Sequence, residues 1–86
     1  ESLGPNEGIV FAYGTEGSRS FVMREMAFPL DIVFVDGEGQ VIAIFEAAAD
    51  DDRTFTARAR WVIETNRGYT ATHGIAVGDE VRGLPR

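Results

Sequence analysis

The sequence predicts a mostly β domain of the α+β class: a small rolled sheet or barrel-like set of antiparallel strands with one short helix. Short β-branched and aromatic runs have strand length, glycine-rich turns separate them, and a single stretch carries helical signals. The chain has 86 residues, the size of one small domain. We therefore expect residues 1–86 to fold as a single unit.

The first predicted hairpin comes from residues 8–13 (GIVFAY) and 20–24 (SFVMR), which are rich in the residue types that strands favour. Residues 14–18 (GTEGS) between them carry two glycines. Because glycine accepts the positive φ that tight hairpin turns need, we expect two short strands joined by a turn.

The second predicted hairpin pairs residues 31–36 (DIVFVD) with 40–46 (QVIAIFE) around a turn at 36–39 (DGEG). Apolar side chains occupy odd and even positions alike in both segments. Since a strand points successive side chains to opposite faces, both faces of this hairpin should be covered. This pattern favours a rolled or barrel-like sheet over an open sheet with one wet face.

The middle of the chain predicts a loop and then a strand. Residues 47–59 follow neither the strand nor the helix period, so we expect a loop that Phe55 anchors to the body of the domain. Residues 60–65 (RWVIET) have strand composition.

The last part of the chain predicts the one helix. Residues 66–74 suit one or two helical turns, with Asn66 as the N-terminal cap and Gly74 in the left-handed conformation that ends a helix. A turn at Gly78 and Asp79 should then lead into a last short strand.

The composition excludes several classes of function. Fourteen acidic against eight basic residues give a net charge of −6, which disfavours a nucleic-acid partner because such partners need clustered cations. The lack of cysteine excludes disulfides and thiolate sites, and one histidine cannot form a multi-histidine zinc site. We therefore expect no metal and no cofactor. No apolar run is long enough to span a membrane, so we expect no membrane partner for this segment.

The types of charged residue indicate the environment of the source organism more than a binding partner. All eight basic residues are arginine and none is lysine. Together with the acidic surplus, this is typical of a cytoplasmic protein from a salt-adapted or GC-rich organism, in which hydrated carboxylates maintain solubility. We therefore expect a cytoplasmic, acidic, halophilic protein.

Several motifs occur in an order that resembles a known family. They are GIVF at 8–11, FVMREM at 21–26, PLDIVFVDG at 29–37, WVIE at 61–64 and VGDEV at 77–81. This ordered set resembles uncharacterised protein family 0127, also called domain of unknown function 192. The resemblance implies a compact, mostly β fold with short helical turns. Members of that family usually begin with a further strand, which we expect residues 1–86 to lack. The resemblance implies no particular reaction.

Met23, Arg24 and Asp31 form the favoured candidate ligand-binding site. The Asp31 carboxylate begins an otherwise apolar strand, where it could bind a ligand or accept backbone N–H groups. The Arg24 guanidinium could hold a polar or anionic ligand beside it, or pair with it structurally. Apolar residues nearby could line a groove or belong to the core: Phe21, Met23, Met26, Phe28 and Trp61.

Glu64 is the fourth candidate ligand-binding residue. With Asp31 it could form the paired carboxylates of a hydrolase or lyase, provided that both groups share one cleft; otherwise it is a satisfied polar strand residue. His73 could shuttle protons or cap the helix. The three aspartates at 50–52 could hold a divalent cation, although their spacing favours a solvated loop.

Three functions follow from these residues. We favour a non-enzymatic binding or accessory module, because the sequence carries no nucleophile and base pair and thus no catalytic residue. The first alternative is a carboxylate-based hydrolase or lyase that uses Asp31 and Glu64. The second is a structural or interaction domain that uses an exposed strand edge, for example as a homodimer.

Overall fold

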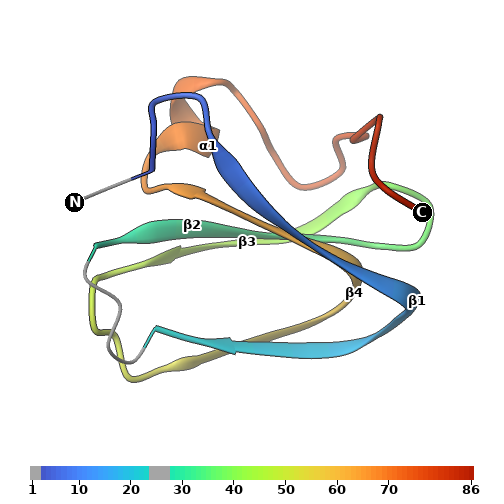
Figure 1. The fold of residues 1–86 in the computed structure, drawn as a ribbon, viewed down its shortest axis with the longest axis horizontal. Coiled ribbons are helices and arrows are strands. Elements are labelled where there is room, and N and C mark those ends of the chain that lie inside the picture. The colour runs from blue at the N-terminus through green and yellow to red at the C-terminus, as the bar shows by residue number, and fades with distance from the viewer. Residues whose placement is uncertain (1–2, 24–27) are drawn as a thin grey trace.

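The computed structural model describes residues 3–23 and 28–86 (Figure 1). Four antiparallel strands form one sheet in the order β1-β4-β2-β3, and a single-turn helix, α1, follows them. The elements are β1 (Gly8–Val22), β2 (Leu30–Val35), β3 (Val41–Ala47), β4 (Thr54–Asn66) and α1 (Tyr69–Thr72). The mostly β class with one short helix is therefore confirmed.

The predicted first hairpin is wrong, because β1 is one continuous strand. It pairs with β4 on both sides of an irregularity, at Ala12 opposite Trp61 and at Gly17 opposite Ala59. Between these two pairs the chain advances five residues along β1 but only two along β4. Strand β1 therefore bulges and bends there and does not reverse direction. The prediction assumed that Gly14 and Gly17 adopt the positive φ of a tight hairpin turn. Neither of them has a positive φ in the structure.

The predicted loop at 47–59 is also wrong over its second half, since β4 begins at Thr54. The first residues of β4 alternate exposed and covered side chains, with Phe55 and Ala59 buried. Small alanines occupy inward positions here, and they weaken the apolar alternation that indicates a strand. The prediction that Phe55 anchors this segment is confirmed, because its side chain is 5 % exposed and lies in the core.

The sheet is rolled but not closed. Strands β1 and β4 run from the upper layer of the molecule into the lower one, where their distal halves lie beneath β2 and β3 (Figure 1). In the described part of the chain, β1 and β3 end the strand order and do not pair with each other. The rolled alternative of the prediction is thus confirmed, whereas barrel closure is not.

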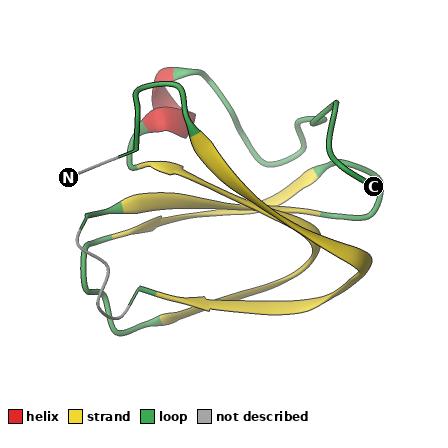
Figure 2. Cartoon of the chain, viewed as in Figure 1, coloured by secondary structure: helices red, strands yellow, loops and turns green. Residues whose placement is uncertain are grey.

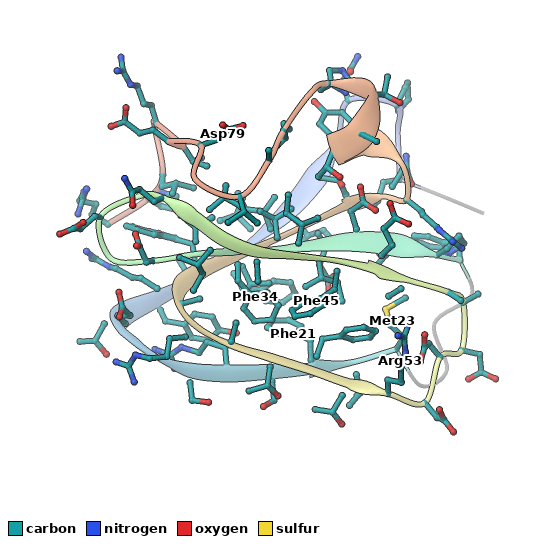
Figure 3. All side chains as sticks on the ribbon, turned by 180° about the vertical axis from the view of Figure 1, so that it is seen from behind. Phe21, Met23, Phe34, Phe45, Arg53 and Asp79 are labelled. Carbon is teal, nitrogen blue, oxygen red and sulfur yellow. The ribbon has the colours of Figure 1, made fainter. Side chains whose placement is uncertain are left out.

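Strand β2 lies at the centre of the fold and is buried at every position, which confirms that both of its faces are covered. Its Ile32 and Phe34 point into the space enclosed by the roll, where Phe34 lies near Phe21 and Phe45 (Figure 3). Val33 and Val35 point to the opposite side and form a second cluster with Val41 and Trp61. We call the first side the aromatic face and the second the groove face.

The second hairpin is confirmed. Its turn closes through Asp36, whose Oδ1 accepts the backbone N–H groups of Glu38 and Gln40 at 2.9 and 3.0 Å. Gly39 has a φ of 86°, which is the left-handed conformation that glycine permits without strain. The predicted last strand is shorter than expected, because it reduces to a single bridge between Gln40 and Glu80.

The helix is shorter than the predicted 66–74, and Gly68 takes the capping position in place of Asn66. The Asn66 side chain instead holds the start of the chain, where it accepts from the Leu3 N–H at 3.0 Å and donates to the Leu3 carbonyl at 2.8 Å. Gly74 has a φ of 66°, so the predicted left-handed residue beyond the helix is confirmed.

Among the described residues, no helix is long and apolar enough to cross a membrane. The edge strand β1 carries Ile9, Val10 and Val22, which are among the exposed large hydrophobic side chains. A homodimer through such an edge stays a prediction, as do the cytoplasmic location and the halophilic adaptation.

Candidate functional site

An apolar groove of about 320 Å³ lies between the groove face of the sheet and residues 67–81, which we call the arch. The arch contains α1 and the loop after it, and it passes over the sheet (Figure 2). Its apolar lining combines residues of β1, β2, β3 and β4 with two residues of the arch: Val10, Val33, Val41, Ile63, Ile75 and Val81.

Asp31 fixes the helical end of the arch to the sheet. Its side chain is fully buried, and its Oδ1 accepts the Gly68 N–H at 3.2 Å. Its Oδ2 accepts both the backbone N–H of Thr70 at 3.0 Å and the Thr70 hydroxyl at 2.7 Å. The carboxylate therefore satisfies N–H groups at the start of α1, which have no partner within the helix.

The other end of the arch is held by β3 and the turn before it. Val41 donates its N–H to the Asp79 carbonyl at 2.8 Å and accepts from the Gly78 N–H at the same distance. The Asp79 carboxylate accepts the Ala76 N–H at 2.8 Å and thereby closes the local turn (Figure 3). Because both ends are anchored, the groove is a built feature of the fold and needs no closing motion to form.

The structure does not bring Asp31 and Glu64 together. In the β2 and β4 register, Asp31 lies opposite Thr65 and Ile32 lies opposite Glu64. Since cross-strand partners share a face and neighbours alternate, Asp31 points to the groove face and Glu64 to the aromatic face. The sheet separates the two carboxylates, so they do not form the single cleft that the hydrolase or lyase alternative requires.

Glu64 is 8 % exposed, and burial raises the pKa of its carboxyl group. Its register neighbours are apolar, namely Ile32 on β2 and Ile9 on β1. Within residues 3–23 and 28–86, no hydrogen bond to its side chain is found. This carboxyl group is therefore held in an environment that favours its neutral form.

The raised pKa of Glu64 predicts a pH-dependent contribution to stability. Because the folded protein binds this proton more tightly than the unfolded chain, the contribution is fully present below the ordinary value of 4.5 and is lost as pH rises through the raised pKa. We expect Glu64→Gln to stabilise the protein at pH 7 by roughly 0.5 kcal/mol, and the gain to vanish near pH 4. Urea denaturation at both pH values measures it.

The exposed Glu38 in the turn before β3 provides the matched control for this change, since it loses the same charge without relief from burial. A gain in Glu64→Gln that is equal at both pH values, or is reproduced by Glu38→Gln, contradicts the assignment.

The other predicted site residues that the structure describes are not among the lining of the groove. Met23 is 1 % exposed and belongs to the aromatic core, which Phe21 and Phe28 also contact. Trp61 is buried in the second cluster, where its Nε1 donates to the Pro85 carbonyl at 2.6 Å. Of the two alternatives for these side chains, groove or core, the structure therefore shows the core. Arg24 and Met26 lie outside the described residues.

The histidine and the aspartate run have local partners. His73 stacks on Tyr69 with ring centroids 3.9 Å apart, and its Nδ1 lies 2.9 Å from the Tyr69 carbonyl. Arg53 pairs with Asp51 at 2.7 Å and lowers the pKa of that carboxyl group to about 2. Over the described ranges, no cluster of three or more residues suited to a metal ion is present.

The groove could not be located from the sequence, because its lining comes from every strand and from the arch. One signal did point to it: the groove-face residues Val33 and Val35 are as apolar as their core-facing neighbours Ile32 and Phe34. That pattern shows that something covers this face, although it does not reveal that the cover leaves a hollow.

Comparison with known proteins identifies one family and two similar solved structures. The DUF192 family, described as an uncharacterized ACR, matches residues 1–83. A solved protein of unknown function from Novosphingobium aromaticivorans is similar at 34 % identity and a TM-score of 0.88 over 94 % of this chain. One from Sinorhizobium meliloti, described as a candidate transcription regulator, has 23 % identity and a TM-score of 0.85 over 91 %. The chain spans 60 and 63 % of these two proteins, and no curated protein matches it.

Proposed function

The chain belongs to the uncharacterised DUF192 family, and we propose that it is a non-enzymatic binding module whose groove takes a small, mostly apolar ligand. The observation that carries this proposal is the apolar groove itself, about 320 Å³ in volume, on the groove face. Pockets that bind small molecules have volumes of roughly 300 to 1,000 Å³ and are lined mainly by apolar side chains with a few polar groups.

The lining also supports binding without catalysis. Its polar side chains are those of Asn6, Glu7, Thr65, Tyr69 and Thr70. A nucleophile needs an adjacent base to activate it, and the carboxylate beside the Thr70 hydroxyl is occupied by backbone N–H groups as well. We therefore assign Asp31 a positioning role, in which it holds the Thr70 wall of the groove, instead of direct contact with the ligand.

A titration with hexanol tests the proposal, since this small apolar probe carries no charge. We expect amide signals of the arch and of the groove-face strands to shift in NMR spectra as hexanol is added. In Val10→Trp, the larger side chain should fill the mouth of the groove and weaken binding at least about fivefold. The affinity follows from the concentration dependence of the shifts.

Val22→Trp is the matched control. Val10 and Val22 are both valines of β1, 44 and 50 % exposed, and of the two Val10 alone lines the groove. The proposal fails if hexanol shifts no groove signal in the wild-type protein. It also fails if both tryptophan variants weaken binding equally.

A further inference from the structure

We propose that the ligand of this groove is an amphiphilic cation, with an apolar body on the groove face and an ammonium group beside Glu7. This inference rests on the proposed binding function and adds the chemical class of the ligand to it. It follows from which polar atoms line the groove and from the direction in which their hydrogen bonds run.

Both threonine hydroxyls of the lining have already used their single proton. The Thr70 hydroxyl donates to Asp31 Oδ2 at 2.7 Å, and the Thr65 hydroxyl donates to the Asn66 carbonyl at 3.3 Å. A hydroxyl has one proton and two lone pairs, so toward a ligand these oxygens can act only as acceptors. A ligand group that contacts these two oxygens must therefore bring hydrogen-bond donors.

Glu7 adds a negative charge to this acceptor set. Among the described lining residues it is the one with a charged side chain, and it is exposed directly before β1. Its Oε1 accepts the Gly4 N–H at 2.8 Å, which holds the side chain in place. A donor that is itself positively charged gains most here, because charge-assisted hydrogen bonds are stronger than neutral ones.

The same surroundings disfavour an anion such as a fatty-acid carboxylate. Moving a carboxylate from water into the groove costs free energy unless a cation or several donors compensate it. The donor side chains of the described lining, Asn6 and Tyr69, are neutral, and no arginine, lysine or histidine is among its residues. The chain also carries a net charge of −6. The expected order of affinity at equal chain length is therefore amine, then alcohol, then carboxylate.

Three probes of equal chain length test this order: hexylamine, hexanol and hexanoate, each titrated at neutral pH and followed by NMR. We expect the protonated amine to bind about tenfold more tightly than the alcohol, and the carboxylate to bind more weakly than both. The largest shift that separates the amine from the alcohol should fall at the start of β1. The uncharged alcohol tests the apolar groove alone. If the alcohol binds but the amine binds no more tightly, the charge assignment fails, whereas if the alcohol does not bind, the proposed groove function fails.

Glu7→Gln assigns the preference to one side chain, since the amide retains an oxygen for the Gly4 N–H but loses the charge. In this variant, amine and alcohol affinities should agree within about twofold. Glu38→Gln is the matched control, because it removes an equal charge from an exposed turn outside the groove. Hexanoate binding as tightly as hexylamine overturns the inference. Equal losses in both variants overturn it as well, since net charge alone would then explain the preference.

Discussion

Asp31→Ala is expected to lower the free energy of unfolding by about 3 kcal/mol and to release α1 from the sheet. The change removes a fully buried carboxylate that accepts three hydrogen bonds, from the Gly68 N–H, the Thr70 N–H and the Thr70 hydroxyl. Each of these donors then lacks a partner inside the protein. The lowest-energy response is for the first turn of the arch to move into water, which also opens the groove.

Urea denaturation measures the loss of stability, and amide hydrogen exchange locates it. Protection should fall most at Gly68 and Thr70, whose N–H groups bond to Asp31, and least at the centre of β2 and β4. Hexanol binding should weaken in parallel.

Two further variants separate the parts of this effect. Thr70→Val removes the hydroxyl and retains both N–H bonds, so a loss of about 1 kcal/mol is expected. Asp31→Asn keeps the volume and one acceptor oxygen, and its loss should lie between those of the other two variants. If Asp31→Ala costs no more than Thr70→Val, or if exchange rises evenly over the whole sheet, Asp31 does not anchor the arch.

The elements that the sequence predicted correctly are those whose signals are local. The turn at 36–39 closes through Asp36 and a positive φ at Gly39, and both depend on residues within that turn. The prediction that both faces of β2 are covered followed from its apolar run, because a strand with one solvent-exposed face alternates apolar and polar residues. The family resemblance added the order of the motifs, and the match over residues 1–83 confirms it.

The elements that the sequence did not predict depend on contacts between residues that are far apart in the sequence. Whether GTEGS at 14–18 reverses the chain or bulges within a strand is decided by pairing with β4, more than 40 residues later. Similarly, residues 54–59 become a strand because β1 lies beside them and Phe55 meets Phe45 in the core, at 5.3 Å between ring centroids. Neither partner is visible within a sequence window of strand length.

The candidate site shows the same division. Asp31 was singled out because a polar residue began an apolar strand, and its bonding to backbone N–H groups was one of the two expected roles. Its partners belong to α1 and not to its own strand entry, because the fold places the arch over β2. The prediction that Asp31 and Glu64 share a cleft was wrong because residue types do not show which face of the sheet a side chain occupies. That depends on the register of the strands, which places the two carboxylates on opposite faces.

Phe34→Ala should be the most destabilising of these changes, with a loss of about 4 kcal/mol. The Phe34 side chain is fully buried on the aromatic face. Its ring makes edge-on contacts with Phe21 and Phe45, at centroid distances of 6.0 and 5.6 Å. These two rings belong to the bent half of β1 and to β3, so Phe34 links the two layers of the roll. Thermal and urea denaturation measure the loss.

Phe34→Leu separates the ring contacts from simple burial. Leucine fills much of the same volume, so the cost should fall to about 1.5 kcal/mol, much of it from the lost edge-on contacts. Phe34 lies on the face opposite the groove, and the groove-face residues Val33 and Val35 keep their positions as long as β2 remains paired. Hexanol affinity should therefore be unchanged in Phe34→Leu, in contrast to Asp31→Ala, although both variants lose stability. Equal loss of hexanol affinity in these two variants would mean that binding follows global stability, and the groove would then have no separate anchor in Asp31.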